Sequence, residues 1–215
     1  MSTQSVVSEL LHSAYANALM RYKDLHTEFA QLQHRLPIPC DNAAINTQAI
    51  GQFDFIIRCL EDEIAEARQN QTSLEMRFPM ILNIQMSWSE LWIIGLYEIL
   101  RSAKEYNRNF VDLDLFQRVE SVRIPLAKYQ IAKDRALQAP LYFLSVGNTY
   151  SAERLEKYDK SDAQRSYTVS RASSARGSFM WKVLVTKPDP REIWIERREI
   201  SDSFVEFLRK LPSRT

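Results

Sequence analysis

Glycine, cysteine and histidine are scarce in this chain of 215 residues, which contains four glycines, two cysteines and three histidines. So few glycines argue against a glycine-rich phosphate-binding loop and against an all-β fold built on many tight turns. Cys40 and Cys59 form no CxxC pair, so we expect neither a disulfide framework nor a zinc site. The histidines His12, His26 and His34 show no metal-binding spacing. The sequence therefore predicts no metal and no cofactor.

The chain also lacks an excess of charge of either sign, since it has 28 basic and 27 acidic side chains. This balance gives no overall electrostatic reason to bind nucleic acid. The N-terminus has no basic segment followed by an apolar one, so we predict no signal peptide and expect a cytoplasmic protein. Residues 80–100 are apolar and long enough to span a membrane, but they include Glu90 and Glu98. Charged side chains are costly at the centre of a bilayer, so we expect no membrane span.

Apolar residues are plentiful, at 45% of the chain, and they recur in steps of three and four that are typical of helices. The pattern predicts long helices over residues 5–36, 47–67 and 79–107, and a fourth helix that begins after Asp112 or Asp114. The first of these carries a seam of nearly four heptads, which favours packing against another helix. On the second helix we expect the acidic side chains to lie mostly on the outer face; they are Glu61, Asp62, Glu63 and Glu66.

The last third of the chain has a different pattern. Residues 139–148 fit a helix or a strand equally well, and residues 151–159 suggest a short helix. Residues 163–187 contain five basic residues, no acid and many serines, so we expect a linker or a mobile basic loop there. Alternating apolar residues on both sides of KPDP predict a β-hairpin. Ser203 and Glu206 match a capping box for a final helix that ends before Pro212.

These patterns together predict a mainly α fold, an antiparallel bundle of long helices with a small C-terminal β-hairpin plus helix. We expect residues 1–160 to form the helical bundle domain. Residues 161–215 would then form a basic, serine-rich linker followed by the hairpin and terminal helix, as a subdomain packed on the bundle.

The apolar segment WSELWIIGLYEILR, residues 88–101, carries charges on one side only. At about 100° per residue, Glu90, Tyr97 and Arg101 fall on one narrow stripe with Glu98 beside it. Either this stripe is exposed to solvent and stabilised by the ion pairs Glu98–Arg101 and Arg101–Glu105, or it faces a cleft. In the second case the acids would be answered by cations of the next helix, Arg123 or Lys128.

The segment Arg21-Tyr-Lys-Asp-Leu-His26 resembles the Arg-x4-6-His pattern of the HEPN ribonucleases, which are helical bundles that often dimerise. In that family the arginine and histidine converge on RNA across a dimer cleft. The resemblance implies a ribonuclease that uses Arg21 and His26. Here Tyr22 replaces the polar residue that usually follows the arginine, and the two side chains could act together only through a partner chain.

The basic segment suggests another alternative, a nucleic-acid-binding accessory protein. Its cations are interleaved with aromatic residues, a composition that tracks phosphates and stacks bases. The candidate residues are Arg165, Arg171, Arg176 and Lys182. Aromatic side chains in a hairpin also pack commonly against a helix, so both interpretations stay open.

Repeated helical seams are present in this sequence, whereas a recognisable catalytic constellation is not. We therefore expect a non-catalytic interaction or regulatory protein, more a binding protein than an enzyme. Its first helix would bind a protein partner or a second copy of the chain. The HEPN-like ribonuclease and the nucleic-acid-binding protein remain the alternatives.

Overall fold

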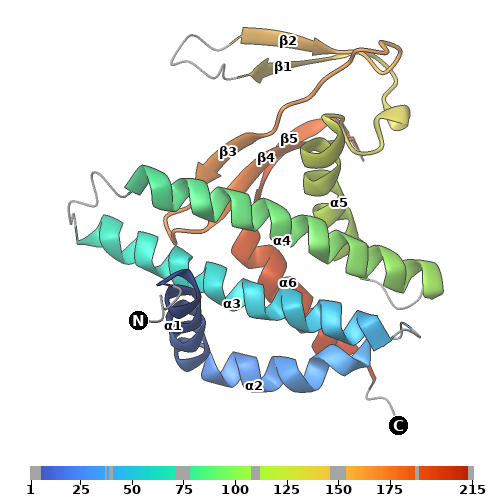
Figure 1. Cartoon of the computed structure of the whole chain (residues 1–215). Helices are drawn as coiled ribbons and strands as arrows, with labels where there is room; N and C mark the ends of the chain where they lie inside the picture. The colour runs from blue at the N-terminus through green and yellow to red at the C-terminus, as the bar shows by residue number, and fades with distance from the viewer. Residues whose placement is uncertain are drawn as a thin grey trace.

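A computed structural model of the chain describes residues 6–36, 38, 41–70, 78–107, 112–145, 154–186 and 189–212. The described structure is mainly helical and contains two small antiparallel sheets (Figure 1). The α-helices are α1 (Val6–Arg21), α2 (Lys23–Leu32), α3 (Asp41–Gln69), α4 (Phe78–Tyr106), α5 (Leu113–Lys128) and α6 (Arg197–Lys210). Two short 3-10 helices are η1 (Gln33–Arg35) and η3 (Asp134–Ala136). None of the described helices offers a stretch both long and apolar enough to cross a lipid bilayer.

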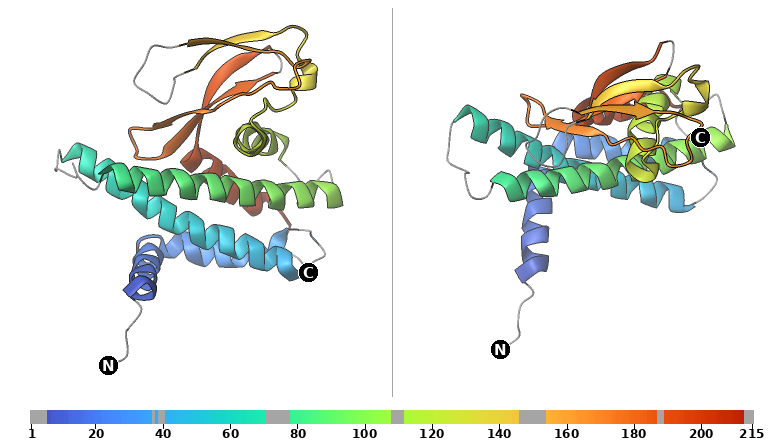
Figure 2. Two further views of the ribbon diagram at one scale, coloured as in Figure 1. Left: turned by 45° about the horizontal axis from the view of Figure 1, so that its top comes forward. Right: turned by 90° about the horizontal axis from the view of Figure 1, so that it is seen from above.

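The two longest helices, α3 and α4, lie side by side along much of their length (Figure 1). Their contact surfaces are apolar at helical spacing, with Ile57 and Ile64 from α3 and Leu96 and Leu100 from α4 almost wholly buried. The sheets and α5 lie on one side of this pair, whereas α1 and α2 lie on the other (Figures 1 and 2).

Helix α5 begins where the sequence predicted. The Asp112 side chain caps it by accepting hydrogen bonds from the backbone N–H groups of Asp114, at 3.0 Å, and Leu115, at 3.1 Å. The apolar residues Leu115, Val119 and Val122, spaced by four and three along this helix, are buried, whereas Tyr129 at its end is 63% exposed. The helix ends at Lys128, and the C-cap residue Tyr129 adopts a left-handed conformation with φ 54°.

The expected continuous first helix over residues 5–36 is wrong, because the chain turns at Tyr22 between α1 and α2. Tyr22 has φ −113° and ψ 33°, which lies outside helical geometry. The turn lets Ala18 of α1 and Phe29 of α2 both reach the core, where each is buried. Tertiary packing thus outweighs the local helical pattern at this point.

The two sheets come from the last third of the chain. Strands β1 (Leu141–Ser145) and β2 (Arg154–Tyr158) form one antiparallel hairpin, with Leu141 opposite Tyr158. The helix expected over residues 151–159 is therefore wrong from Arg154 onward, because pairing with β1 holds this segment extended. The fully buried Tyr158 and the exposed Leu155 and Tyr142 show which sides of the hairpin face inward and outward.

The second sheet has the strand order β3 (Ser170–Ser173), β4 (Phe179–Val185), β5 (Arg191–Glu196). Strands β4 and β5 form the predicted hairpin, with Val185 opposite Arg191, whereas Lys187 and Pro188 of its turn lie outside the described residues. The basic serine-rich segment is not simply a mobile loop, since it supplies β3 and β4. Its residues Tyr167 and Val169 are buried, and the Tyr167 ring packs edge-on against Phe143 of β1.

The final helix begins earlier than its expected capping box. It starts at Arg197, directly after β5, and Ser203 lies inside it, where its hydroxyl donates to the Glu199 carbonyl at 2.7 Å. Buried ionic contacts of Arg197 fix the junction between strand and helix, so a local side-chain cap is not what begins α6. Phe204, Leu208 and Leu211, which recur at helical spacing near the end of the chain, are buried.

Candidate functional site

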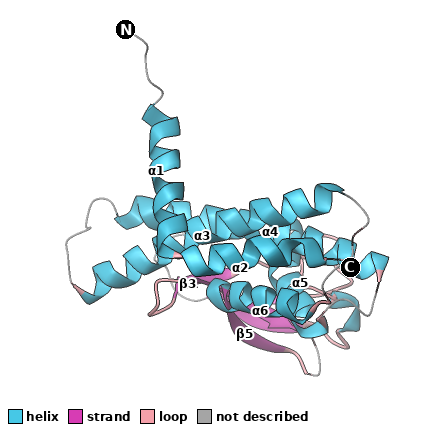
Figure 3. Ribbon diagram, turned by 90° about the horizontal axis from the view of Figure 1, so that it is seen from below, coloured by secondary structure: helices cyan, strands magenta, loops and turns pink. Residues whose placement is uncertain are grey.

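Helix α1 carries an exposed apolar surface on the outside of the protein. Every side chain from Val6 to Ala14 is exposed. The large apolar ones have exposed fractions of 66% for Val6, 67% for Val7, 65% for Leu10 and 53% for Leu11. This half of α1 points away from the other helices (Figures 2 and 3).

The exposed apolar side chains share one face of α1. At about 100° per residue, Val6, Val7, Leu10 and Leu11 fall within an arc of about 140°. Ala18, which is fully buried where α1 meets α3, falls in the same arc. The face that packs on α3 at one end of α1 therefore continues, uncovered, to the other end.

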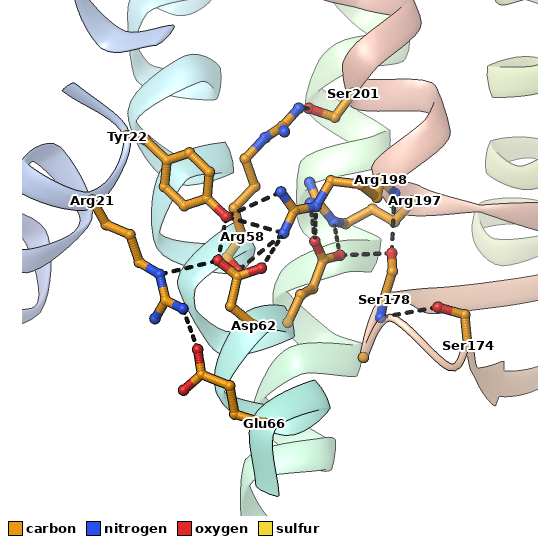
Figure 4. Close-up of polar contacts among 12 residues, drawn as sticks. Arg21, Tyr22, Arg58, Asp62, Glu66, Ser174, Ser178, Arg197, Arg198 and Ser201 are labelled. Atoms are coloured by element: carbon orange, nitrogen blue, oxygen red, sulfur yellow. Dashed lines mark hydrogen bonds and ion pairs between the residues drawn. The ribbon is translucent and has the colours of Figure 1, made fainter. Parts of the chain in front are cut away.

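The base of α1 is tied to α3 by charged side chains (Figure 4). Arg21 pairs with Glu66, and its Nε lies 3.2 Å from Asp62 Oδ2. The hydroxyl of Tyr22 donates to Asp62 and accepts from both terminal nitrogens of Arg198, each at 3.1 Å. These contacts fix the corner at which α1 leaves α2, so they set the direction in which the exposed face is presented.

Behind this corner lies a buried ionic network centred on Arg197, whose side chain has no exposed surface. Arg197 binds Glu61 with two hydrogen bonds, Nε to Oε1 at 2.5 Å and Nη2 to Oε2 at 2.6 Å, and its Nη1 donates to Asp54. Glu61, also fully buried, accepts further hydrogen bonds from Arg198 Nε at 2.7 Å and the Ser178 hydroxyl at 2.8 Å.

Arg58 completes the network on the other side of Asp54. Its Nε donates to Asp54 Oδ2 at 2.7 Å, and its Nη2 donates to Ser201 and, at 2.6 Å, to Asp202. Ser201 donates in turn to Asp54 at 2.8 Å. The formal charges of the buried and half-buried side chains in the network cancel. These side chains are three carboxylates and three guanidinium groups: Asp54, Glu61, Asp62, Arg58, Arg197 and Arg198. Buried charges require such pairing.

The buried carboxylates of this network, Asp54 and Glu61, stay ionised. Burial alone would raise the pKa of Asp54, but Arg58 and Arg197 outweigh it and lower that pKa to about 2. The pKa of Glu61 is lowered for the same reason, by Arg197 and Arg198 against its burial. Burial and the hydrogen bond to Asp62 raise the pKa of Tyr22 to about 12. None of these groups is poised to exchange a proton near neutral pH, so the network has the properties of a structural anchor.

A tight turn between β3 and β4 delivers Ser178 to Glu61. Gly177 adopts φ +74°, and its N–H donates to the Ser174 carbonyl at 3.0 Å. Its carbonyl accepts from the buried Gln85 side chain at 2.6 Å. A Cβ at Gly177 would overlap the Glu61 carbonyl oxygen, so only glycine allows this close approach to α3.

The expectation that the acidic run of α3 lies mostly on an outer face is wrong for Glu61. The burial of Glu61 could have been inferred from helical spacing. Asp54 and Glu61 are seven residues apart and, at about 100° per residue, lie on the same side as Ile57 and Ile64. Two acids on an apolar face imply buried cations. One of them, Arg58, lies a single turn from Asp54, but Arg197 and Arg198 are far away in the sequence.

The structure places Arg21 and His26 on different helices and in different surroundings. Arg21, at the end of α1, is held by Asp62 and Glu66. His26, on α2, packs its ring edge-on against Phe55, with a centroid distance of 5.7 Å. The two candidates for RNA cleavage are therefore not brought together within one chain.

The polar stripe of α4 forms a ladder of ion pairs. Arg101 pairs with Glu98 at 2.8 Å and with Glu105 at 2.5 Å, and Arg123 of α5 reaches Glu98 at 3.3 Å. Arg123 also lies over the ring of Tyr97, 4.7 Å from its centroid.

Glu90 forms an ion pair, at 2.6 Å, with Arg171 of β3, a partner that the sequence did not suggest. Lys128 is exposed and does not reach the stripe acids. Two pockets along α5 are lined by other residues than Glu90, Tyr97, Glu98 and Arg101, although Lys128 lines one of them.

The four cations suggested for nucleic-acid binding are each paired with a carboxylate. The pairs are Arg165–Asp134 at 2.8 Å, Arg171–Glu90 at 2.6 Å, Arg176–Glu196 at 3.1 Å and Lys182–Glu192 at 2.6 Å. The aromatic side chains between them are buried, with exposed fractions of 2% for Tyr167, 6% for Phe179 and 0% for Trp181. The structure therefore does not present these rings to a base.

Comparison with known proteins adds no assignment to this geometry. No family model, no curated protein and no solved structure matches the chain. Within the described ranges, no group of three or more histidine, cysteine, aspartate or glutamate side chains is arranged to hold a metal ion.

Proposed function

We propose that this chain is a non-catalytic interaction protein that associates through α1, and that the partner is a second copy of the chain. The observation that carries the proposal is the exposure of Val6, Val7, Leu10 and Leu11 on one face of a projecting helix. An exposed apolar face of this kind is typical of a protein–protein contact. A short helix also gains most of its stability from packing, which this half of α1 lacks in a single chain.

A second copy suits the face because a two-fold pair of α1 helices would bury both faces at once with the same residues. The ionic corner at Arg21 and Tyr22 supports this arrangement, since it holds α1 in one direction and lowers the entropy lost on pairing. We further propose that α3, α4 and α5 form the antiparallel bundle expected from their stripes and serve as the rigid body for α1.

Sedimentation velocity from low to high micromolar concentration tests the proposal. We expect the wild type to be a dimer and the double variant Leu10→Ser with Leu11→Ser to be a monomer whose helical content is unchanged outside α1. The matched control is Leu91→Ser on α4, because Leu91 is exposed to a similar extent, 61%, but lies away from α1. A wild type that remains monomeric throughout, or a double variant that still dimerises, would exclude α1 as the contact.

A further inference from the structure

A pocket of about 360 Å³ lies between α5 and the end of the β4–β5 hairpin. Residues of α5, the segment after it and both strands line the pocket. Its volume lies within the range of small-molecule sites, which is about 300–1,000 Å³. The network around Arg197 and the exposed face of α1 do not contribute to it, so this site is separate from the proposed contact surface.

The charge of the lining is positive. Three cations, Arg118, Lys133 and Arg191, face one acid, Asp114, so the lining has a net charge of +2. Arg191 is exposed and forms no ion pair among the described residues. Arg118 pairs at 3.2 Å with Glu199, whose side chain is 53% exposed, and Lys133 pairs at 3.0 Å with Glu120, whose side chain is only 17% exposed. A contact with an exposed carboxylate contributes little, so Arg118 can exchange Glu199 for a bound anion, whereas Lys133 keeps its partner and adds a donor to the rim of the pocket.

Part of the lining is apolar. Val185, Ile193 and Ile195 line the pocket from β4 and β5, and Ile193 and Ile195 point to the same side as Arg191 because the three alternate along the strand. A ligand that fits this lining needs both an anionic group and an apolar body.

Lys133 enters this lining from a strained backbone position. Its φ is +57°, in the left-handed region that residues other than glycine rarely adopt. The turn is held by its neighbours: the Lys133 carbonyl accepts from Ala136 N at 2.9 Å, and Asp134 binds Tyr158 and Arg165 at 2.9 Å and 2.8 Å. A strained residue whose surroundings fix it in place is a common feature of ligand sites.

We propose that this pocket binds a small molecule in which a phosphate monoester is attached to an apolar body. A phosphate monoester carries about −1.5 to −2 charges at pH 7 and offers three acceptor oxygens, one more than a carboxylate, to the cations of the lining. The guanidinium groups of Arg118 and Arg191 suit its oxygens, because arginine binds phosphate with two parallel hydrogen bonds. The apolar body would lie against Ile193 and Ile195. It could be the base of a nucleotide or an alkyl chain.

The test is titration of the full-length, ¹⁵N-labelled protein with AMP, octyl phosphate and adenosine, followed through the backbone amides of Gln117, Thr186 and Ile193. We expect saturable shifts at these amides with AMP, octyl phosphate or both, and none with adenosine. A response to AMP alone assigns a nucleotide, and a response to octyl phosphate alone assigns a lipid-like monoester.

Two variants remove the charge that the proposal depends on, Arg191→Gln and Lys133→Asn, the latter chosen because asparagine tolerates the left-handed conformation. Each should weaken binding about tenfold, the equivalent of ~1.4 kcal/mol. Arg176→Gln, at an exposed arginine outside the pocket lining, should leave binding unchanged. The proposal is overturned by equal binding of adenosine, by no binding of either phosphate, or by binding that neither pocket variant weakens.

Discussion

Arg197 and Glu61 form a two-armed ion pair in which neither side chain has any surface exposed to water. The pair joins the first residue of α6 to the middle of α3, 136 residues earlier in the chain. Because the surrounding charges cancel, the pair is tolerated in the interior. Removing the charge of one partner would leave the other partner as a buried charge without a counter-charge.

Glu61→Gln should therefore destabilise the protein strongly. The substitution preserves the shape of the side chain but leaves Arg197 and Arg198 with one negative charge fewer in a buried site. Breaking a buried ion pair from one side costs about 3–5 kcal/mol, which for a chain of this size lowers the melting temperature by roughly 6–20 °C. Thermal unfolding followed by circular dichroism measures the change.

The matched control for that substitution is Glu66→Gln, on the same helix. Glu66 also pairs with an arginine, Arg21, but its side chain is 58% exposed. Exposed ion pairs contribute about 0–1 kcal/mol, so this variant should melt close to the wild type. If both variants lost the same number of degrees in melting temperature, burial would not be what makes the Glu61 pair stronger than the Glu66 pair.

Acid should unfold the protein in a range set by the same network. The pKa of Asp54 falls from an ordinary 3.8 to about 2 in the folded chain. A carboxyl group with a lowered folded pKa stabilises the fold above its unfolded pKa, and this stability is lost as the pH falls through the folded value. Asp54 therefore contributes about 2 kcal/mol that is present above pH ~4 and lost between about pH 4 and pH 2.

Melting temperatures measured across this range check the expectation. The wild type should lose stability steeply below pH ~4, whereas Asp54→Asn should start from a lower stability and show a shallower decline. A wild-type curve that is flat between about pH 5 and pH 2.5 would contradict the assignment of lowered pKa values to the network.

Gly177→Ala should be far more costly than an ordinary glycine-to-alanine change. The added Cβ would meet the backbone of α3 at Glu61, and φ +74° is strained for alanine. We expect a loss of ~2 kcal/mol or more, measured by urea unfolding. Gly95→Ala is the comparison, because its Cβ would meet the flexible end of the Ile50 side chain rather than backbone. If Gly95→Ala lowers the free energy of unfolding more than Gly177→Ala does, the turn at Gly177 is not packed directly against the backbone of α3.

Tyr22→Phe tests the corner between α1 and α2. The substitution removes the hydroxyl that joins Asp62 to Arg198 and leaves the ring in place. Loss of a hydrogen bond to charged groups should cost about 1.5–3 kcal/mol and should loosen α1, which then exchanges its amide hydrogens faster. Tyr106→Phe, at a tyrosine that is 57% exposed, is the control and should change neither property. Unchanged exchange in α1 of Tyr22→Phe would mean that other contacts hold the corner.

Each of the two alternative functions predicts an experimental result that the other does not. A HEPN-like ribonuclease would lose RNA cleavage in His26→Ala, and a nucleic-acid-binding protein would lose affinity steeply with salt and in Arg171→Gln. Because His26 packs on Phe55 and Arg171 pairs with Glu90, we expect no RNA cleavage that depends on His26 and no steep salt dependence. Either effect, if observed, would replace the interaction role proposed above.

Much of the local structure could be predicted from the sequence, because it depends on neighbouring residues. The steps of three and four in α3, α4 and α5 predicted buried stripes, and Asp112 predicted the start of α5. The alternation around KPDP predicted the β4–β5 hairpin, and the spacing of Glu98, Arg101 and Glu105 predicted their ion pairs. In each case the interacting groups lie within a turn or a hairpin of one another.

Only the tertiary structure decided the features that depend on distant partners. The sequence of residues 5–36 favours one helix, but the break at Tyr22 arises from Asp62 on α3 and Arg198 on α6. The segment Arg154–Tyr158 is a strand because β1 pairs with it. Glu61 is inside rather than outside because Arg197 arrives to neutralise it. A buried charge is allowed only where a counter-charge meets it, and no local pattern shows which distant arginine will do so.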